Sequence, residues 1–344
     1  MEQTQMNEFL NHYCDTHMFS GSIRITCKDN ILYQAFCGKA DFEKNIPLNE
    51  QSVFSLYSLS KPFCAIGFLK LYDKGLVDID VHPSTYLPEM KKFDEKVTLR
   101  HMLHHISGLP DFLQTKEFAD KYINGPYHKL REHLQLLSEY PMLFEPGTGD
   151  RYANINFVAL ALIIENVSGL SYADYMRREV FEPLGMNSAC IDEPGVYVPN
   201  RVKGYELREN QLVHIDRAID WMLGAGDILG TLNDVYCLNK AIKEGKLLRP
   251  ETWQEALTPS PINHMGMGCT ITDWHGKKRI THNGGHLGFR TLHVQLPEDD
   301  FDIILLSNTG FGDARNEIAE AIYSIYYGDD NSVETKVEMD KGYI

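Results

Sequence analysis

Strand-forming segments lie near the two ends of the chain, and a long stretch without them lies between. Near the N-terminus, residues 22–27 and 31–37 are joined by a turn at 28–30 and predict a hairpin. A lone two-stranded hairpin is marginally stable in water, so we expect it to pair with strands from elsewhere. Four segments near the C-terminus predict an antiparallel meander that supplies them: residues 268–273, 278–282, 291–296 and 302–307.

The rest of the chain is predicted to be rich in helices and loops. Its clearest helix is bounded by Asn154 and Gly169. The fold class is therefore α/β, of the α+β kind: an antiparallel sheet flanked by helices, with an all-helical domain inserted between its strands. We expect a discontinuous sheet domain (1–80 and 251–328), a helical domain (81–250) and a C-terminal tail (329–344). Helices are expected at residues 5–17, 58–74, 155–167 and 312–326.

Ser58 and Lys61 form the first candidate site. Proline is tolerated only in the first turn of a helix, so Pro62 places a helix start close to Ser58. At this spacing the two side chains share one face, and the Ser58 amide has no intrahelical partner. A serine hydroxyl needs a base, and burial lowers the pKa of a lysine toward that role. The alternative is that Ser58 caps the helix and Lys61 is solvated, because Ser-x-x-Lys also arises by chance.

Two downstream segments strengthen the catalytic interpretation. Tyr152 and Asn154 precede the 155–167 helix, where they are placed to relay a proton and to bind a carbonyl. The alternative is that Asn154 caps that helix and Tyr152 is half-buried packing. The second segment, residues 281–290, leaves a strand and is dense in glycine, which permits close backbone approach to a ligand. The alternative there is an ordinary hairpin loop.

The sequence resembles a known family at three places in register: Ser58-x-x-Lys61, Tyr152-x-Asn154 and His282-x-Gly284. These look like the active-site elements of the serine β-lactamase-like and penicillin-binding-protein-like hydrolases, in the branch of class C β-lactamases and esterases. The resemblance spans about residues 19–325. It implies the β-lactamase/transpeptidase-like fold.

The same resemblance implies a role for each matching residue. Ser58 would be acylated, and Lys61 and Tyr152 would share proton transfer, with the identity of the base left open. Asn154 would orient the substrate. The backbone amide of Gly285 would be the second oxyanion donor, beside that of Ser58. Water would then hydrolyse the acyl-enzyme.

The third element departs from the usual pattern of the family. In β-lactamases and carboxypeptidases it is commonly Lys-Thr-Gly or Lys-Ser-Gly, whose cation and hydroxyl suit a substrate carboxylate. Here His282 and Asn283 take those places, and a neutral histidine binds a carboxylate less well. The substitution favours a small ester, amide or peptide as substrate. Arg290 offers a replacement cation, although a solvated surface arginine is the simpler interpretation.

Three functions remain open at this point. The first is a serine hydrolase that acts through an acyl-enzyme on a small ester or amide. The second is a D-alanyl-D-alanine carboxypeptidase or β-lactamase. The third is a penicillin-binding sensor that is acylated without turnover.

Charge and hydropathy limit the possible partners. The formal net charge of −15 argues against nucleic acid, because phosphate binding needs clustered lysine and arginine. No apolar run approaches the ~20 residues that span a bilayer. The N-terminal segment lacks the pattern of a signal peptide, so a cytoplasmic location is expected, and a removed signal leaves export open. The oligomeric state is open.

Cysteines and histidines are the residue types that would form a metal or redox site. The seven cysteines are scattered, odd in number and without a C-x-x-C pair, which favours free thiols in a reducing compartment. His101, His104 and His105 cluster closely, but no glutamate completes an H-E-x-x-H motif. We therefore expect a structural role for them, and no metal or cofactor.

Overall fold

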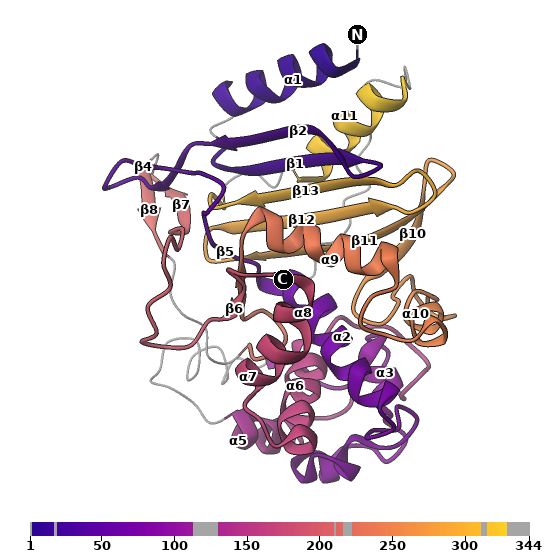
Figure 1. Ribbon diagram of the computed structural model, residues 1–344. Helices are drawn as coiled ribbons and strands as arrows, with labels where there is room; N and C mark the ends of the chain where they lie inside the picture. Colours follow the sequence, from indigo (N-terminus) through magenta and orange to yellow (C-terminus); the bar gives the residue numbers. More distant parts are fainter. Residues whose placement is uncertain are drawn as a thin grey trace.

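The computed structural model describes residues 2–16, 19–112, 130–209, 211–215, 222–310 and 315–328 (Figure 1). Its centre is a six-stranded antiparallel sheet in the order β10-β11-β12-β13-β1-β2. The strand β1 pairs with β13 along its whole length, so the N-terminal hairpin and the C-terminal meander share one sheet, as predicted. The strands are β1 (Gly21–Cys27), β2 (Asn30–Cys37), β10 (Thr270–Trp274), β11 (Lys277–His286), β12 (Phe289–Leu296) and β13 (Phe301–Ser307).

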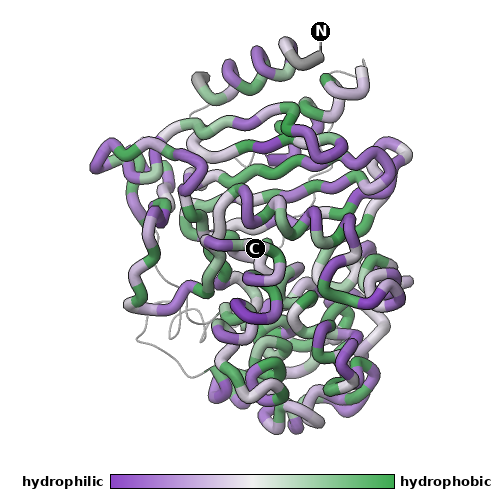
Figure 2. The backbone as a smooth tube through the Cα atoms, in the orientation of Figure 1, coloured by the Kyte–Doolittle hydropathy of each residue, from purple (hydrophilic) through white to green (hydrophobic). Residues whose placement is uncertain are grey.

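Helices cover both faces of this sheet. The helices α1 (Glu2–Thr16) and α11 (Arg315–Tyr327) pack on one face, and α9 (Leu232–Glu244) packs on the other (Figure 1). Alternate residues of β13 therefore enter different cores: Ile303 lies with α11, and Ile304 lies with the helical region. Every residue of β13 is buried, and Figure 2 shows the matching apolar colour along the inner strands.

The helical region lies at the opposite end of the molecule from α1 (Figure 1). Its axis is α6, whose first eleven residues are all buried and which ends at Gly169 in a left-handed conformation. The helix α2 packs beside α6, which joins the segment after Ser58 to the segment after Ala153. The region contains α2 (Ser60–Asp73), α3 (Leu99–Leu103), α5 (Leu130–Leu137), α6 (Asn154–Ser168), α7 (Tyr172–Met176) and α8 (Glu182–Leu184), with α10 (Pro250–Ala256) near the sheet.

The segment 81–250 is not all helical, which corrects the sequence-based expectation. A three-stranded sheet joins β5 (Phe54–Ser55), β9 (Ile228–Gly230) and β6 (Cys190–Ile191). These strands have two or three residues each, too short to show an alternating pattern in the sequence. The division into domains at residues 80 and 250 stays a prediction. Two further hairpins are β3 (Lys39–Asp41) with β4 (Ile46–Pro47), and β7 (Tyr205–Arg208) with β8 (Gln211–His214).

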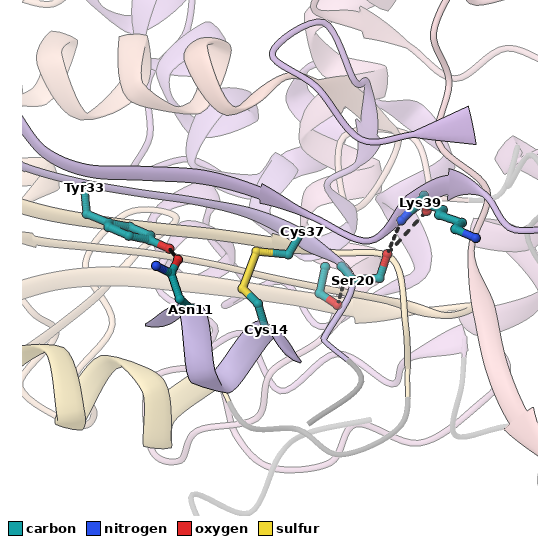
Figure 3. Close-up of a disulfide and its surroundings, with 7 residues drawn as sticks. Asn11, Cys14, Ser20, Tyr33, Cys37 and Lys39 are labelled. Atoms are coloured by element: carbon teal, nitrogen blue, oxygen red, sulfur yellow. Dashed lines mark hydrogen bonds between the residues drawn. A yellow bond between two sulfur atoms is a disulfide. The ribbon is translucent and has the colours of Figure 1, made fainter. Parts of the chain in front are cut away.

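A disulfide joins Cys14 of α1 to Cys37 at the end of β2 (Figure 3). The expectation of seven free thiols is therefore wrong, and with it the argument from cysteine usage to a reducing compartment. The partners are 23 residues apart in sequence, and only the packing of α1 over the hairpin brings them together. A hydrogen bond of 3.1 Å from Tyr33 to Asn11 supports the same contact. The other five cysteines are free.

No single helix in the described part of the chain is long and apolar enough to cross a bilayer. The bent pair Asn154–Ser168 and Tyr172–Leu184 meets that test only when its two arms are combined. The acidic tail predicted at 329–344 lies outside the described residues.

Candidate active site

Ser58 lies in a 3-10 turn, Tyr57–Leu59, that leads directly into α2. Pro62 is the third residue of α2, a position where its missing N–H costs no helical hydrogen bond, as the sequence predicted. Tyr57 has a φ of 49°, a left-handed conformation that is costly for a bulky residue. Its buried ring packs on His286 and Phe289, so tertiary contacts hold the strained turn that presents Ser58.

Lys61 is fully buried, and its Nζ has three oxygen neighbours. It lies 3.1 Å from Ser58 Oγ, 2.9 Å from Asn154 Oδ1 and 2.7 Å from the carbonyl oxygen of Ala225. Burial lowers the pKa of Lys61 to about 7, although the Asp111 carboxylate opposes the shift. A substantial fraction of Lys61 is therefore neutral near neutral pH. The alternative of a solvated first-turn lysine is wrong.

The Tyr152 side chain lies over the same ammonium group. Lys61 Nζ is 4.7 Å from the Tyr152 ring centroid, and the His282 ring lies 6.1 Å from that ring. The imidazole of His105 stacks on the Tyr152 ring with 4.3 Å between ring centroids, and its Nδ1 accepts the Ala153 amide. The side chain is half-buried but its hydroxyl is shielded from solvent, and burial raises the Tyr152 pKa well above its usual value. Hydrogen bonding with Ser58 opposes part of that rise.

Asn154 is the first residue of α6, and Ala153 occupies the N-cap position. The Asn154 side chain does not cap the helix but turns toward Lys61, which excludes the capping alternative. Its Nδ2 donates to Asp111 Oδ2 at 3.1 Å, and the backbone N–H of Ile155 donates to Asp111 Oδ1 at 3.1 Å. Asp111 is a buried carboxylate that the sequence did not mark as part of the site.

Strand β11 lies against the turn that carries Ser58. A Cβ at Gly284 would lie 2.1 Å from the Leu56 carbonyl oxygen and 3.0 Å from the Leu59 nitrogen. Thr291, the cross-strand partner of Gly284, donates its hydroxyl to the same Leu56 oxygen at 2.9 Å. Only glycine fits at 284, so strand β11 approaches the Ser58 turn closely at this residue. Residues 282–286 continue the strand, and the hairpin turn of this segment is confined to residues 287–288.

His282 is buried and neutral. Burial and the nearby charge of Lys61 lower the pKa of His282 to about 3. Its Nδ1 lies 2.7 Å from the Asn283 carbonyl oxygen, which can only accept, so Nδ1 carries the proton. Nε2 is then an acceptor, and it has no hydrogen-bond partner among the described residues. This position therefore offers a lone pair where a lysine would offer a positive charge.

Two other sequence candidates have different surroundings. Arg290 donates to the carbonyl oxygens of Phe289 and Gly310, so it is not the fully solvated arginine of the simpler interpretation. His104 contacts the Met265 carbonyl oxygen through Nδ1 at 2.8 Å. Within the described ranges, no three His, Cys, Asp or Glu side chains are grouped so as to hold a metal ion.

Comparisons with known proteins agree over nearly the whole chain. A family model described as Beta-lactamase matches residues 4–326. Penicillin-binding protein 4* of Bacillus subtilis (strain 168) is 29% identical over 326 residues, covering 86% of this chain and 69% of that protein. D-aminopeptidase of Gluconobacter oxydans (strain 621H) is 23% identical over 297 residues, covering 84% of this chain and 55% of that protein.

A solved structure shows the same arrangement of sheet and helices. The crystal structure of a penicillin-binding protein from Bacillus halodurans superposes with a TM-score of 0.81 and 25% identity. The match covers 92% of this chain and 99% of that one. It extends over both the sheet and the helical region that together hold the candidate site.

Proposed function

Because the chain belongs to the Beta-lactamase family and is a serine hydrolase, we propose that Ser58 is its nucleophile and Lys61 the base that activates it. The single observation that carries this proposal is the buried Lys61 Nζ at 3.1 Å from Ser58 Oγ. The β-lactamase/transpeptidase-like fold expected from the sequence is confirmed by the match to a penicillin-binding protein structure. One fold can carry many activities, so the activity is inferred from the residues of the site.

The proposed reaction proceeds through an acyl-enzyme. Ser58 Oγ forms a bond to the acyl carbon while its proton passes to neutral Lys61, and the oxyanion is held by the Ser58 and Gly285 amides. The bond to the leaving group then breaks, and the leaving group takes that proton through the Tyr152 hydroxyl. Water then adds its oxygen to the acyl carbon and gives a proton to Lys61. The bond to Ser58 Oγ breaks, and Lys61 returns that proton to Ser58. No cofactor takes part in these steps.

The electrostatics of the site favour Lys61 over Tyr152 as the base. A base near neutral pH needs a pKa close to that pH. Burial brings the pKa of Lys61 to about 7, whereas burial moves the pKa of Tyr152 further above its usual value. Tyr152 therefore stays a neutral phenol that both accepts and donates a hydrogen bond, which suits a proton relay.

We propose a small ester or amide without an anchoring carboxylate as the substrate. The neutral His282 supplies no charge for a carboxylate, and its Nε2 is an acceptor. A D-amino-acid amide or peptide is the second candidate. It is supported by the relative named D-aminopeptidase and by the lone pair of His282, which suits an N–H donor on the substrate.

A substrate screen with intact-protein mass analysis tests this function. The probes are a neutral p-nitrophenyl ester, a D-amino-acid p-nitroanilide and benzylpenicillin. We expect product release from the ester or the anilide without a lasting adduct. Fastest turnover of benzylpenicillin would contradict the proposed substrate class. A persistent adduct with no product from any probe would instead favour the acylated sensor.

A further inference from the structure

The three oxygen neighbours of Lys61 match the donors of an ammonium group. A protonated lysine has three N–H groups, and Ser58 Oγ, Asn154 Oδ1 and the Ala225 carbonyl oxygen lie within 3.1 Å of Nζ. A neutral lysine has two N–H groups and one lone pair. The direction of that lone pair depends on which neighbours can only accept.

The Ala225 and Asn154 oxygens are held toward Lys61 in different ways. The Ala225 carbonyl oxygen is a backbone acceptor under any condition. The Asn154 amide can rotate by half a turn, which would present its NH₂ group to Lys61 instead of its oxygen. In that orientation Lys61 would donate to Ser58 or direct its lone pair at the amide, and it would not act as a base toward Ser58.

Asp111 removes this ambiguity. Burial raises the pKa of Asp111, and the Ile155 N–H, the Lys61 charge and the Asn154 amide oppose that rise. The ionised carboxylate only accepts, so its Oδ2 at 3.1 Å from Asn154 Nδ2 holds the amide nitrogen on its own side. Its Oδ1 accepts the Ile155 amide in the first turn of α6, which fixes the carboxylate itself. The Asn154 oxygen is thereby left facing Lys61.

We propose that Asp111 is the positioning residue of this site, acting through the Asn154 amide to direct the Lys61 lone pair at Ser58. With Asn154 Oδ1 and the Ala225 oxygen each taking one N–H of neutral Lys61, the remaining direction is toward Ser58 Oγ. Asp111 also adds a negative charge that keeps the pKa of Lys61 from falling further under burial. This inference rests on the proposed roles of Ser58 and Lys61.

Other titratable groups face Lys61, and their states bear on any pH profile. Burial keeps His105 and His282 neutral by lowering their pKa values, and keeps Tyr152 and Cys64 neutral by raising theirs. Asp227 is the other carboxylate near Lys61, and burial raises its pKa to about 7. The Asp111 charge also contributes to the raised pKa of Tyr152, so Asp111→Asn should lower that pKa as well as the pKa of Lys61.

The test is a pH profile of ester hydrolysis combined with a double-mutant cycle. Asp111→Asn removes the charge and lets the amide of residue 154 rotate, so kcat should fall by roughly 10²-fold. The acid limb of kcat/KM should move to lower pH, because losing a negative charge lowers the pKa of Lys61. In an Asn154→Ala background the same change should lower kcat by no more than about twofold, because the two residues act as one unit.

Asp302→Asn is the matched control. Asp302 is also a buried carboxylate that accepts from an asparagine amide, Asn239 Nδ2, at 3.0 Å. The Asp302→Asn variant should lose stability while keeping the wild-type kcat and the wild-type acid limb of kcat/KM. If Asp111→Asn does not fold, Asp111→Glu keeps the charge, and it should lower kcat with the acid limb unmoved and with the same non-additivity.

The inference is overturned if the losses from Asp111 and Asn154 add, or if Asp111→Asn leaves the acid limb in place. A failure of the proposed roles of Ser58 and Lys61 would give a different result. Ser58→Ala would then retain turnover, whatever the Asp111 variants do.

Discussion

The proposed chemistry depends on the buried amine of Lys61. Lys61 has no exposed surface, yet it is an ionisable group whose desolvation disfavours its charged form. Its Nζ contacts Ser58, Asn154 and Ala225 oxygens, which offset part of that cost. A residue placed for packing alone would be apolar, so the cost of burying this lysine supports its proposed role as the base.

The pH dependence of stability should report the state of Lys61. Its pKa falls from 10.5 to about 7 on folding, so the unfolded chain binds the proton more tightly. Wild-type protein therefore loses stability as the pH falls from above 10 toward 7, and the loss is complete below 7. Compared with Lys61→Met, the wild type should lose about 2 kcal/mol of unfolding free energy between pH 9 and pH 7. Urea unfolding of both proteins measures the difference, and a pH-independent difference would refute it.

Catalysis should also depend on Lys61, which is expected to contribute activity although it costs stability. Lys61→Met should reduce kcat/KM for an ester by roughly 10³-fold or more, since it removes one partner of a catalytic unit. In the wild type, kcat/KM should rise with pH through an apparent pKa near 7. Initial rates across pH measure this. A flat profile through that range would count against Lys61 as the base.

At the residue scale, the sequence motifs indicate the candidate side chains and the Ser58 and Gly285 amides, but not every backbone group of the site. Ser58, Lys61, Tyr152 and Asn154 were found because three short motifs occurred in register. The Ala225 carbonyl could not be found, since every residue has one and only the fold aims it at Lys61. Asp111 could not be found either, because its partner Asn154 is 43 residues away in the sequence. The only nearby signal is the histidine cluster that ends at His105.

The contact between β11 and the Ser58 turn is the feature at the element scale on which the site depends. The Gly284 position has no room for a methyl group, because it would overlap the Leu56 carbonyl oxygen and the Thr291 hydroxyl. Gly284→Ala should therefore push the strand from the turn, costing about 1–3 kcal/mol of stability and most of the activity.

Gly230→Ala is the control for this substitution. Gly230 lies in β9, and its added methyl would meet only side chains, the nearest being Leu56 Cδ1 at 3.3 Å. It should change both stability and rate little. Thermal unfolding and ester hydrolysis of the two variants provide the comparison, and equal effects would refute a specific role for the β11 contact.

The helix α1 should depend on its disulfide. The bond closes a loop between residues separated by 23 positions, which in the chain-entropy account is worth about 3 kcal/mol. Cys14→Ser should lower stability by a comparable amount, and dithiothreitol should have the same effect on the wild type. Cys190→Ser provides the control, because Cys190 is free. Urea unfolding with and without reductant measures this, and no response to reductant would contradict it.

Long elements were predictable and short ones were not. The six main strands and α6 showed clear periodicity or caps in the sequence, and the pairing of β1 with β13 followed from the instability of a lone hairpin. The strands β6 and β9 owe their place to tertiary pairing, since Cys190 and Ile191 alone carry no pattern. The same is true of the Cys14–Cys37 bond, whose geometry arises only when α1 docks.

The whole molecule sets the electrostatic conditions for its substrates. The net charge of −15 repels anions, and the third-motif position is held by a neutral His282. The nearby Arg315 guanidinium donates to the Gly284 and Thr291 carbonyl oxygens. For an ester bearing a free carboxylate, kcat/KM should rise roughly several-fold from low to high ionic strength. A matched neutral ester should respond little. Equal responses of the two esters would show that global charge does not matter.

The central claim is that Ser58 is the nucleophile, and covalent labelling tests it most directly. A fluorophosphonate should increase the mass of the wild-type protein by that of one label. Peptide analysis should map the label to Ser58. Ser58→Ala should stay folded and take up no label, whereas Ser60→Ala, which removes the neighbouring buried hydroxyl, should still be labelled. Label on another serine, or undiminished labelling of folded Ser58→Ala, would contradict the account.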